Sequence, residues 1–99
     1  MHYVLYASTA AIPFSDNDLA DLLRVSRRNN ASTNVSGMLL YHDSSFLQYI
    51  EGETEDVNAL FDRISADPRH VGVFVLDRAD IDVRGLPDWM MGYEVLPEA

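Results

Sequence analysis

The residue that least fits its surroundings is Gln48, in the segment Phe46-Leu47-Gln48-Tyr49-Ile50-Glu51-Gly52. This segment has the composition of a short strand that ends at Gly52, and side chains two positions apart on a strand share a face. Gln48 therefore shares a face with Phe46 and Ile50, so that face should be buried. A buried amide must find hydrogen-bond partners, because leaving its donors and acceptor unpaired is costly. Either a neighbouring backbone group or another polar group should lie against Gln48.

Other chemically active residues do not form the patterns that catalysis or metal binding requires. His2, His42 and His70 are scattered and form no i,i+4 pair on a helix, so no metal site is expected. No glycine-flanked serine marks a nucleophile, and there is neither a P-loop nor a GxGxxG sequence. Glu51 and Glu53 flank a turn and are expected to be solvated. These residues favour a binding domain over an enzyme, but they do not name its ligand.

Composition and charge exclude several classes of protein. The 99 residues suffice for one domain, residues 1–99, and 47% of them are hydrophobic, as in folded globular chains. The absence of Cys excludes disulfides and thiolate sites. A net charge of −9, with no Lys, argues against binding to nucleic acid or to anionic membranes. No apolar run is long enough to span a membrane and no secretory signal opens the chain, so we expect a cytoplasmic protein.

Runs of apolar and β-branched residues predict five strands. These strands cover residues 2–7, 37–41, 46–51, 71–76 and 89–96. The tight connection His42-Asp43-Ser44-Ser45 predicts that the second and third strands form a hairpin. A polar stretch, residues 77–88, separates the last two strands.

Two amphipathic helices are predicted between the strands. The first begins at Ser15, which can cap it, and Asn29-Asn30 can end it because Asn tolerates the left-handed conformation. The second begins with Thr54 as its cap and ends at Ala66-Asp67-Pro68. The resulting order, β-α-β-β-α-β-β, predicts an α+β fold. Its ferredoxin-like mixed sheet would carry both helices on one face.

Six short motifs resemble those of the BLUF family of blue-light sensors that use flavin. They are Tyr6-Ala7-Ser8, Ser26-Arg27-Arg28-Asn29-Asn30, Gly37-Met38-Leu39-Leu40-Tyr41, Phe46-Leu47-Gln48 with Glu51-Gly52, Asp67-Pro68-Arg69-His70 and Trp89-Met90-Met91-Gly92. Each motif alone is weak, but together they cover nearly the whole chain in the family's order. The predicted order of helices and strands is also that of the family.

This resemblance implies a flavin, FAD, bound noncovalently between the two helices. Its ring would lie over the sheet face that carries Tyr6 and Gln48, and would thereby provide partners for the Gln48 amide. The cofactor-binding positions that match the family's motifs are Tyr6, Ser26, Asn30, Gln48, Asp67, Arg69 and His70. Arg69 or Arg63 would pair with the diphosphate, unless they are solvated surface charges. Asn30 would otherwise be a plain helix C-cap.

The resemblance also implies a photochemical mechanism instead of an enzymatic one. Tyr6 would give an electron to the excited flavin, and its proton would travel through Gln48. Recombination would leave the flavin oxidised and Gln48 in a rearranged hydrogen-bond state. Trp89 and Met91 match a mobile pair near Gln48 that would carry the signal onward, or else they are ordinary core residues.

The output of such a sensor is not visible in the sequence. We expect a separate, unidentified protein partner, or a chain that is a fragment. Two helices cover one face of a sheet, so Tyr3, Leu5, Leu47 and Tyr49 should form an apolar patch on the other face. A homodimer or higher oligomer would cover this patch, unless missing C-terminal helices do. Two alternatives are a ferredoxin-like oligomeric regulatory module without photoactive flavin and a small acyl-phosphate hydrolase on the same fold.

Overall fold

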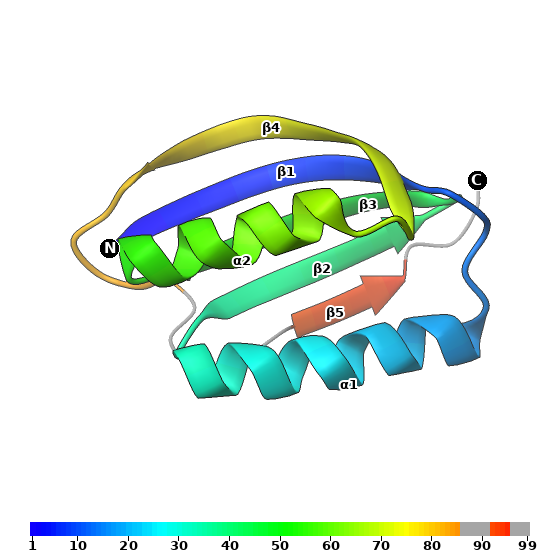
Figure 1. The fold of residues 1–99 in the computed structure, drawn as a ribbon, viewed down its shortest axis with the longest axis horizontal. Helices are drawn as coiled ribbons and strands as arrows, with labels where there is room; N and C mark the ends of the chain where they lie inside the picture. The colour runs from blue at the N-terminus through cyan, green and yellow to red at the C-terminus, as the bar shows by residue number, and fades with distance from the viewer. Residues whose placement is uncertain (86–91, 96–99) are drawn as a thin grey trace.

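The computed structural model describes residues 1–85 and 92–95, which form a five-stranded sheet and two helices (Figure 1). The strands are β1 (His2–Ala10), β2 (Ser36–His42), β3 (Ser45–Gly52), β4 (His70–Asp80) and β5 (Gly92–Val95). The helices are α1 (Asp16–Thr33) and α2 (Thr54–Ala66). This is the predicted order, β-α-β-β-α-β-β. The part of the predicted last strand outside β5 lies outside the described residues.

The strand that carries Gln48 lies at the centre of the sheet. The strand order is β4-β1-β3-β2-β5, so β3 has a neighbour on both sides. The β1–β3, β1–β4 and β2–β3 pairs are antiparallel, whereas β5 is parallel to β2. This mixed sheet and its connections confirm the predicted ferredoxin-like α+β fold.

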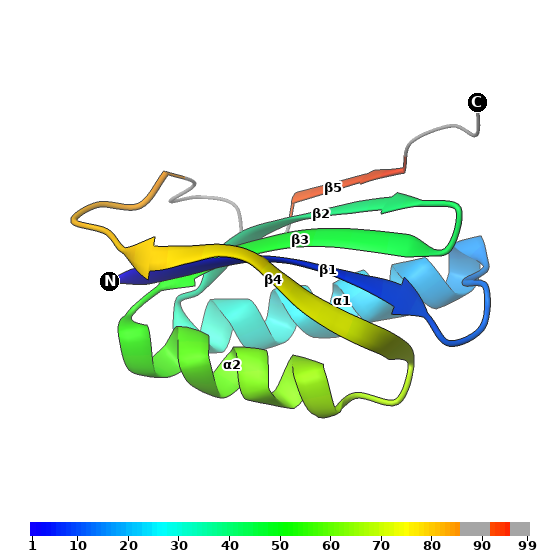
Figure 2. The ribbon, with the colours of Figure 1, turned by 90° about the horizontal axis from the view of Figure 1, so that it is seen from above.

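Both helices lie on the same side of the sheet (Figure 2). The helix-facing side of β3 carries Phe46 and Ile50, both buried, as the alternation of residues around Gln48 predicted. Core residues from the other elements include Val4, Tyr6, Leu39, Leu19, Leu23, Val57 and Leu60. None of the helices in the described part of the chain is both long and apolar enough to cross a bilayer.

Helix α1 ends one turn later than the sequence predicted. Ser15 caps its start, and its hydroxyl accepts a hydrogen bond from the Asp18 N–H at 3.1 Å. The end at Asn29-Asn30 was wrong, because the helix continues to Thr33. Asn34 forms the C-cap with a φ of 57°, and its backbone N–H donates to the Asn30 carbonyl. An Asn does end the helix by tolerating a left-handed conformation, but it is a different Asn.

Three other element boundaries test the sequence predictions. Asp43 and Ser44 both have positive φ, 46° and 64°, which makes the tight hairpin turn that was expected. The predicted capping role of Thr54 was wrong, because Glu53 is the N-cap of α2 and makes no side-chain capping bond. Strand β4 runs on to Asp80, since its pairing with β1 extends as far as His2.

The prediction for Glu51 was wrong, although that for Glu53 was right. Glu53 is exposed, whereas Glu51 is 0% exposed. Strand β3 extends through Glu51, whose carboxylate accepts a hydrogen bond from the backbone N–H of Gly85, in the segment that follows β4. Local sequence does not reveal this environment, because Gly85 lies 34 residues away along the chain.

The C-cap of α1 yields a first prediction. Asn34→Ala should lower the free energy of unfolding by about 1 kcal/mol, because Ala meets a steric penalty at positive φ. Asn34→Gly is the matched control and should be neutral or slightly stabilising, since Gly adopts this conformation without strain. Urea unfolding followed by circular dichroism measures both. An Ala variant as stable as the Gly variant would contradict the assignment of this cap.

Candidate functional site

Gln48 lies opposite Tyr6 in the register between β3 and β1. The Tyr6 hydroxyl donates a hydrogen bond to the Gln48 Oε1 atom, so the amide oxygen has a side-chain partner. Tyr6 is 0% exposed, and its ring lies 5.2 Å from the ring of Phe61 on α2. Burial raises the pKa of Tyr6 well above its usual range, which keeps the phenol protonated as a donor. The two N–H donors of Gln48 are on Nε2, the amide nitrogen, which is not the atom that Tyr6 contacts.

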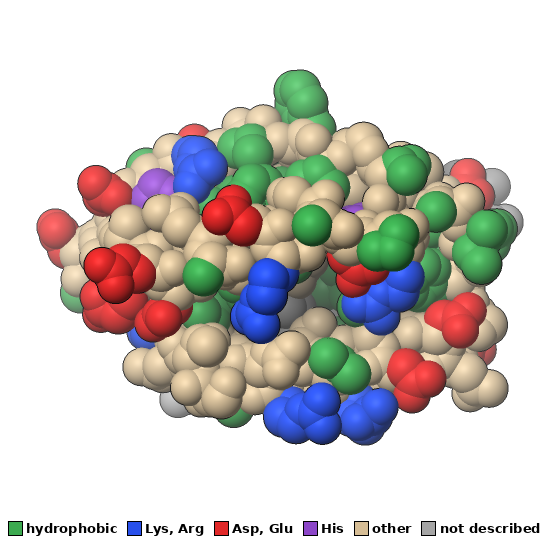
Figure 3. All heavy atoms as spheres, in the orientation of Figure 1, with side chains coloured by type: hydrophobic (Ala, Val, Ile, Leu, Met, Phe, Trp, Pro, Cys, Tyr) green, Lys and Arg blue, Asp and Glu red, His purple; other side chains and the backbone are tan. Residues whose placement is uncertain are grey.

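A cavity lined by Gln48 and by residues of both helices opens to the surface, and Figure 3 shows a hollow between the helices. Counted with its opening to solvent, its volume is ≈ 830 Å³. The lining residues are Phe14, Leu22, Val25, Ser26, Asn29, Asn30, Leu39, Phe46, Gln48, Leu60, Arg63, Ile64, Asp67, Arg69 and His70. Apolar walls with a few converging polar groups suit a flat, largely apolar ring that has a polar edge.

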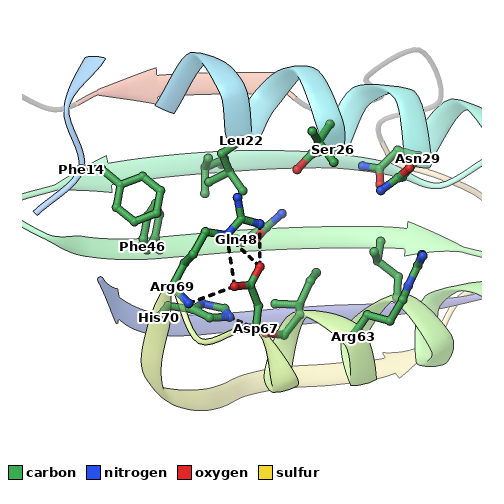
Figure 4. A pocket seen from close by; sticks show the side chains of 15 residues that line it. Phe14, Leu22, Ser26, Asn29, Phe46, Gln48, Arg63, Asp67, Arg69 and His70 are labelled. Carbon is green, nitrogen blue, oxygen red and sulfur yellow. Dashed lines mark hydrogen bonds and ion pairs between the residues drawn. The ribbon is translucent and has the colours of Figure 1, made fainter. Parts of the chain in front are cut away.

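Helix α1 contributes the polar side chains on one wall of the cavity. Ser26, Asn29 and Asn30 line the cavity, and Figure 4 shows Ser26 and Asn29 on the helix above it. Asn30 is 1% exposed and lies inside the helix, so its alternative role as a C-cap was wrong. Asn29 was missed as a lining residue. Its spacing of three residues from Ser26 places both on one helix face, a signal that the sequence does contain.

The segment that follows α2 closes the opposite side of the cavity through an ion pair. The Arg69 guanidinium contacts the Asp67 carboxylate, with 2.5 Å from Nη2 to Oδ2 and 2.9 Å from Nε to Oδ2 (Figure 4). Hydrogen bonds from the Arg69 side chain hold the pKa of Asp67 below its usual range. The charge of Arg69 is therefore largely compensated within the protein.

His70 ties this segment to β1 and to the end of α2. Its Nε2 atom contacts the Ile64 carbonyl, which can only accept, so Nε2 carries a proton. In the neutral ring, Nδ1 then accepts from the Ser8 hydroxyl at 2.9 Å. The ring also meets Phe46 edge-on, with 6.5 Å between centroids. Ser8 was not predicted to have this role, because its partner lies 62 residues away.

Arg63 is the second cation that lines the cavity. It is exposed on α2, and Figure 3 shows basic side chains beside the hollow between the helices. Within residues 1–85, whose side chains the structure describes, Arg63 forms no ion pair. Unlike Arg69, it has no carboxylate partner among these residues, so its positive charge at the rim is available to an anionic group of a ligand.

The structure gathers most of the predicted site residues around this cavity. Ser26, Asn30, Gln48, Arg63, Asp67, Arg69 and His70 line it, and Tyr6 bonds to Gln48 beneath it. Trp89 and Met91 lie outside the described residues. In the part of the chain that the structure describes, no group of His, Asp and Glu side chains could hold a metal ion.

Comparisons with known proteins point to light sensing. The family model of BLUF, sensors of blue-light using FAD, matches residues 1–92. The photoactivated adenylate cyclase subunit beta of Euglena longa is 40% identical over an aligned length of 90 residues, and the match covers 89% of this chain and 10% of that protein. This chain therefore spans about a tenth of the length of that curated relative.

Solved structures agree with this similarity. The dark-state structure of BlrB, a BLUF protein, is 34% identical in sequence and has a TM-score of 0.90. The match covers 95% of this chain and 71% of that one. Klebsiella pneumoniae BlrP1, solved with FMN and cyclic diGMP, is 28% identical with a TM-score of 0.87, and the match covers 95% of this chain and 25% of that one.

The ion pair at the cavity leads to a prediction about pH. Because the pKa of Asp67 is lowered in the folded state, its ionised form stabilises the fold above the unfolded value, about 3.9. This contribution is lost as the pH falls through the lower, folded pKa. Wild type should therefore have a higher free energy of unfolding than Asp67→Asn near about pH 6, where Asp67 is fully ionised. The difference should shrink below about pH 4.

Urea unfolding across this pH range measures the difference. Asp62→Asn is a matched control, because Asp62 is an exposed carboxylate on the neighbouring helix. A difference between wild type and Asp67→Asn that stays constant with pH would contradict the role of the ion pair.

Proposed function

The chain belongs to the BLUF family of blue-light sensors, and on this premise we propose that Tyr6 and Gln48 form its photoactive relay. BLUF domains are flavin sensors, so the chain is a blue-light flavin photoreceptor. The observation that carries the proposal is the hydrogen bond from the Tyr6 hydroxyl to Gln48 Oε1, at the floor of a cavity that opens between the helices. We further propose that residues 1–99 form one photosensory domain.

In this proposal the two side chains move an electron and a proton. Bound flavin supplies, when excited by blue light, an oxidant strong enough to take an electron from a phenol. Tyr6 gives up that electron, and its proton crosses the existing hydrogen bond to Gln48. The amide can pass a proton on because it carries both an acceptor and donors. When the electron and proton return to Tyr6, Gln48 remains in a rearranged hydrogen-bond state, and that state is the signal.

The residues around the cavity suit a flavin with a charged side chain. Ser26 and Asn30 supply polar groups for the polar edge of the ring, and Phe46 supplies apolar contact. The segment with Asp67, Arg69 and His70 borders the remainder of the cofactor. Arg63 is the better candidate for the diphosphate, because Asp67 already compensates Arg69. We propose FAD as the native cofactor, in keeping with the description of the family.

We propose that this chain is a sensor without catalytic activity of its own. The cyclase relative is about ten times longer than the region that it shares with this chain, which supports an effector outside that region. A separate protein or an effector segment would then receive the signal. Trp89 and Met91 are our candidates for the residues that respond to Gln48.

We also propose that a second copy of the chain covers the face of the sheet away from the helices. Phe74 on β4 is 64% exposed and lies opposite Ala7, which is itself paired with Leu47 in the register. Leu5 and Leu47 are partly exposed on this same face. Burying such side chains is worth on the order of 1.5–3 kcal/mol each, and a two-fold pairing places the same patch on both sides.

The relay can be tested by light-minus-dark absorption spectra. Tyr6→Phe and Gln48→Leu should each retain flavin but lose the light-induced red shift, because each removes one hydrogen-bonding partner while keeping most of the packing. Phe61→Leu, a change beside Tyr6 that leaves its hydroxyl in place, serves as the control and should keep the shift. A normal red shift in either relay variant would refute the proposal. The cofactor released by heating should be FAD.

The second copy can be tested by sedimentation at micromolar concentration. Leu5→Asp and Leu47→Asp should convert the associated protein to a monomer, because each buries a charge in the interface. Ile12→Asp is the matched control, since Ile12 is 72% exposed in the loop after β1 and should not affect association. A monomeric wild type, or Leu variants that associate like wild type, would count against this interface.

A further inference from the structure

Glu51 is a buried charge that the proposed relay does not use. It follows Gln48 by three residues on β3, and its side chain points to the opposite face of the sheet. Its Oε2 atom accepts hydrogen bonds from the Tyr49 hydroxyl at 2.8 Å and from the Gly85 backbone N–H at 2.9 Å. A fully buried carboxylate needs such donors, because water does not reach it.

The residue before Gly85 attaches to the same end of the sheet. Arg84 Nη1 donates to the Ser36 hydroxyl on β2 at 2.8 Å and lies 3.5 Å from the Glu51 carbonyl. Arg84 and Gly85 therefore both anchor residues 81–85 to the strands beside them. In Figure 2 this segment, in orange, rises on the side of the sheet away from the helices. The chain then continues into residues 86–91, which include Trp89 and Met91.

A series of side-chain contacts joins Glu51 to other residues on the helix-free face of the sheet. The Tyr49 ring stacks on Tyr3, with 5.5 Å between centroids and 26° between planes. The Tyr3 hydroxyl donates to Asp77 on β4 at 2.6 Å. Burial and the bond to Glu51 raise the pKa of Tyr49, so its phenol remains a donor. The carboxylate is thus held from two directions, by β3 itself and by residues 81–85.

We propose that Glu51 is a positioning residue that holds residues 81–85 against the end of β3 and couples this segment to Gln48. The inference rests on the proposed function, because Gln48 is the residue that light rearranges. Strand β3 is hydrogen-bonded on both sides, so a displacement at Gln48 passes along a stiff backbone. At Glu51 water cannot replace the bond to Gly85, so the segment must follow the strand or lose that bond.

Hydrogen exchange of the flavin-loaded protein, in the dark and under blue light, tests this coupling. In Glu51→Gln the charge-assisted bonds become neutral ones, so residues 81–85 should exchange about tenfold faster than in wild type in the dark. The light-minus-dark difference at these residues should disappear, although the absorption red shift persists. Glu53→Gln is the matched control, because it removes an exposed carboxylate two residues away and should behave like wild type.

The outcomes separate this inference from the proposed function. A wild-type difference at residues 81–85 that survives in Glu51→Gln overturns the coupling, and unchanged dark exchange overturns the positioning role. If wild type itself lacks a red shift, the proposed function fails, but the dark comparison still decides whether Glu51 holds the segment. Should Glu51→Gln not fold, Arg84→Met is the second variant. It removes the neighbouring anchor but leaves the Glu51–Gly85 bond in place, so the light-dependent difference at residues 81–85 must persist, and its loss overturns the inference.

Discussion

A polar amide on the apolar, helix-facing side of a central strand is the constraint on which this structure depends. Gln48 can occupy that position because the β1–β3 register sets Tyr6 directly opposite it. A slip of one residue would turn Gln48 to the other face and break the Tyr6 hydrogen bond. The register is in turn held by the apolar residues Phe46 and Ile50, which must remain on the helix side. The same β1–β3 register therefore satisfies both the packing of the core and the geometry of the Tyr6–Gln48 hydrogen bond.

The two helices meet this requirement without filling the space above Gln48. Helix α1 presents Leu22, Ser26 and Asn29 to the cavity, and α2 presents Leu60 and Ile64. The apolar side chains form the walls of the cavity, and the amide and hydroxyl groups can orient a ligand through directional hydrogen bonds. The same helices that complete the core thus leave a site for a flat ring between them, which is the arrangement that a noncovalent flavin sensor needs.

Strand β3 separates two environments that have different tasks. Its helix side carries Tyr6 and Gln48, the proposed relay, and its other side carries Glu51, the proposed anchor for residues 81–85. Both faces are built on one backbone, and for this reason we propose that a hydrogen-bond change at Gln48 is transmitted through β3 to Glu51. Residues 81–85 follow β4 and precede β5 in the chain, so the proposed anchor lies between β4 and the C-terminal part of the chain.

The sequence by itself determined the order of helices and strands and the site residues that belong to local motifs. Periodicity and turn chemistry are local, so they revealed the hairpin at Asp43-Ser44, the Ser15 cap and the anomalous amide of Gln48. The motifs, through their resemblance to a family, also named residues such as Asn30 and His70 that the structure brings to one cavity.

Tertiary structure decided the contacts between segments that are far apart in the chain. It buried Glu51 and placed its carboxylate against the Gly85 N–H, paired His70 with Ser8, and moved the end of α1 from Asn30 to Asn34. It also distinguished Arg69, which is paired with Asp67, from Arg63 at the rim. The physical reason is that spacing along a chain shows which face a side chain takes, whereas long-range packing decides what covers that face.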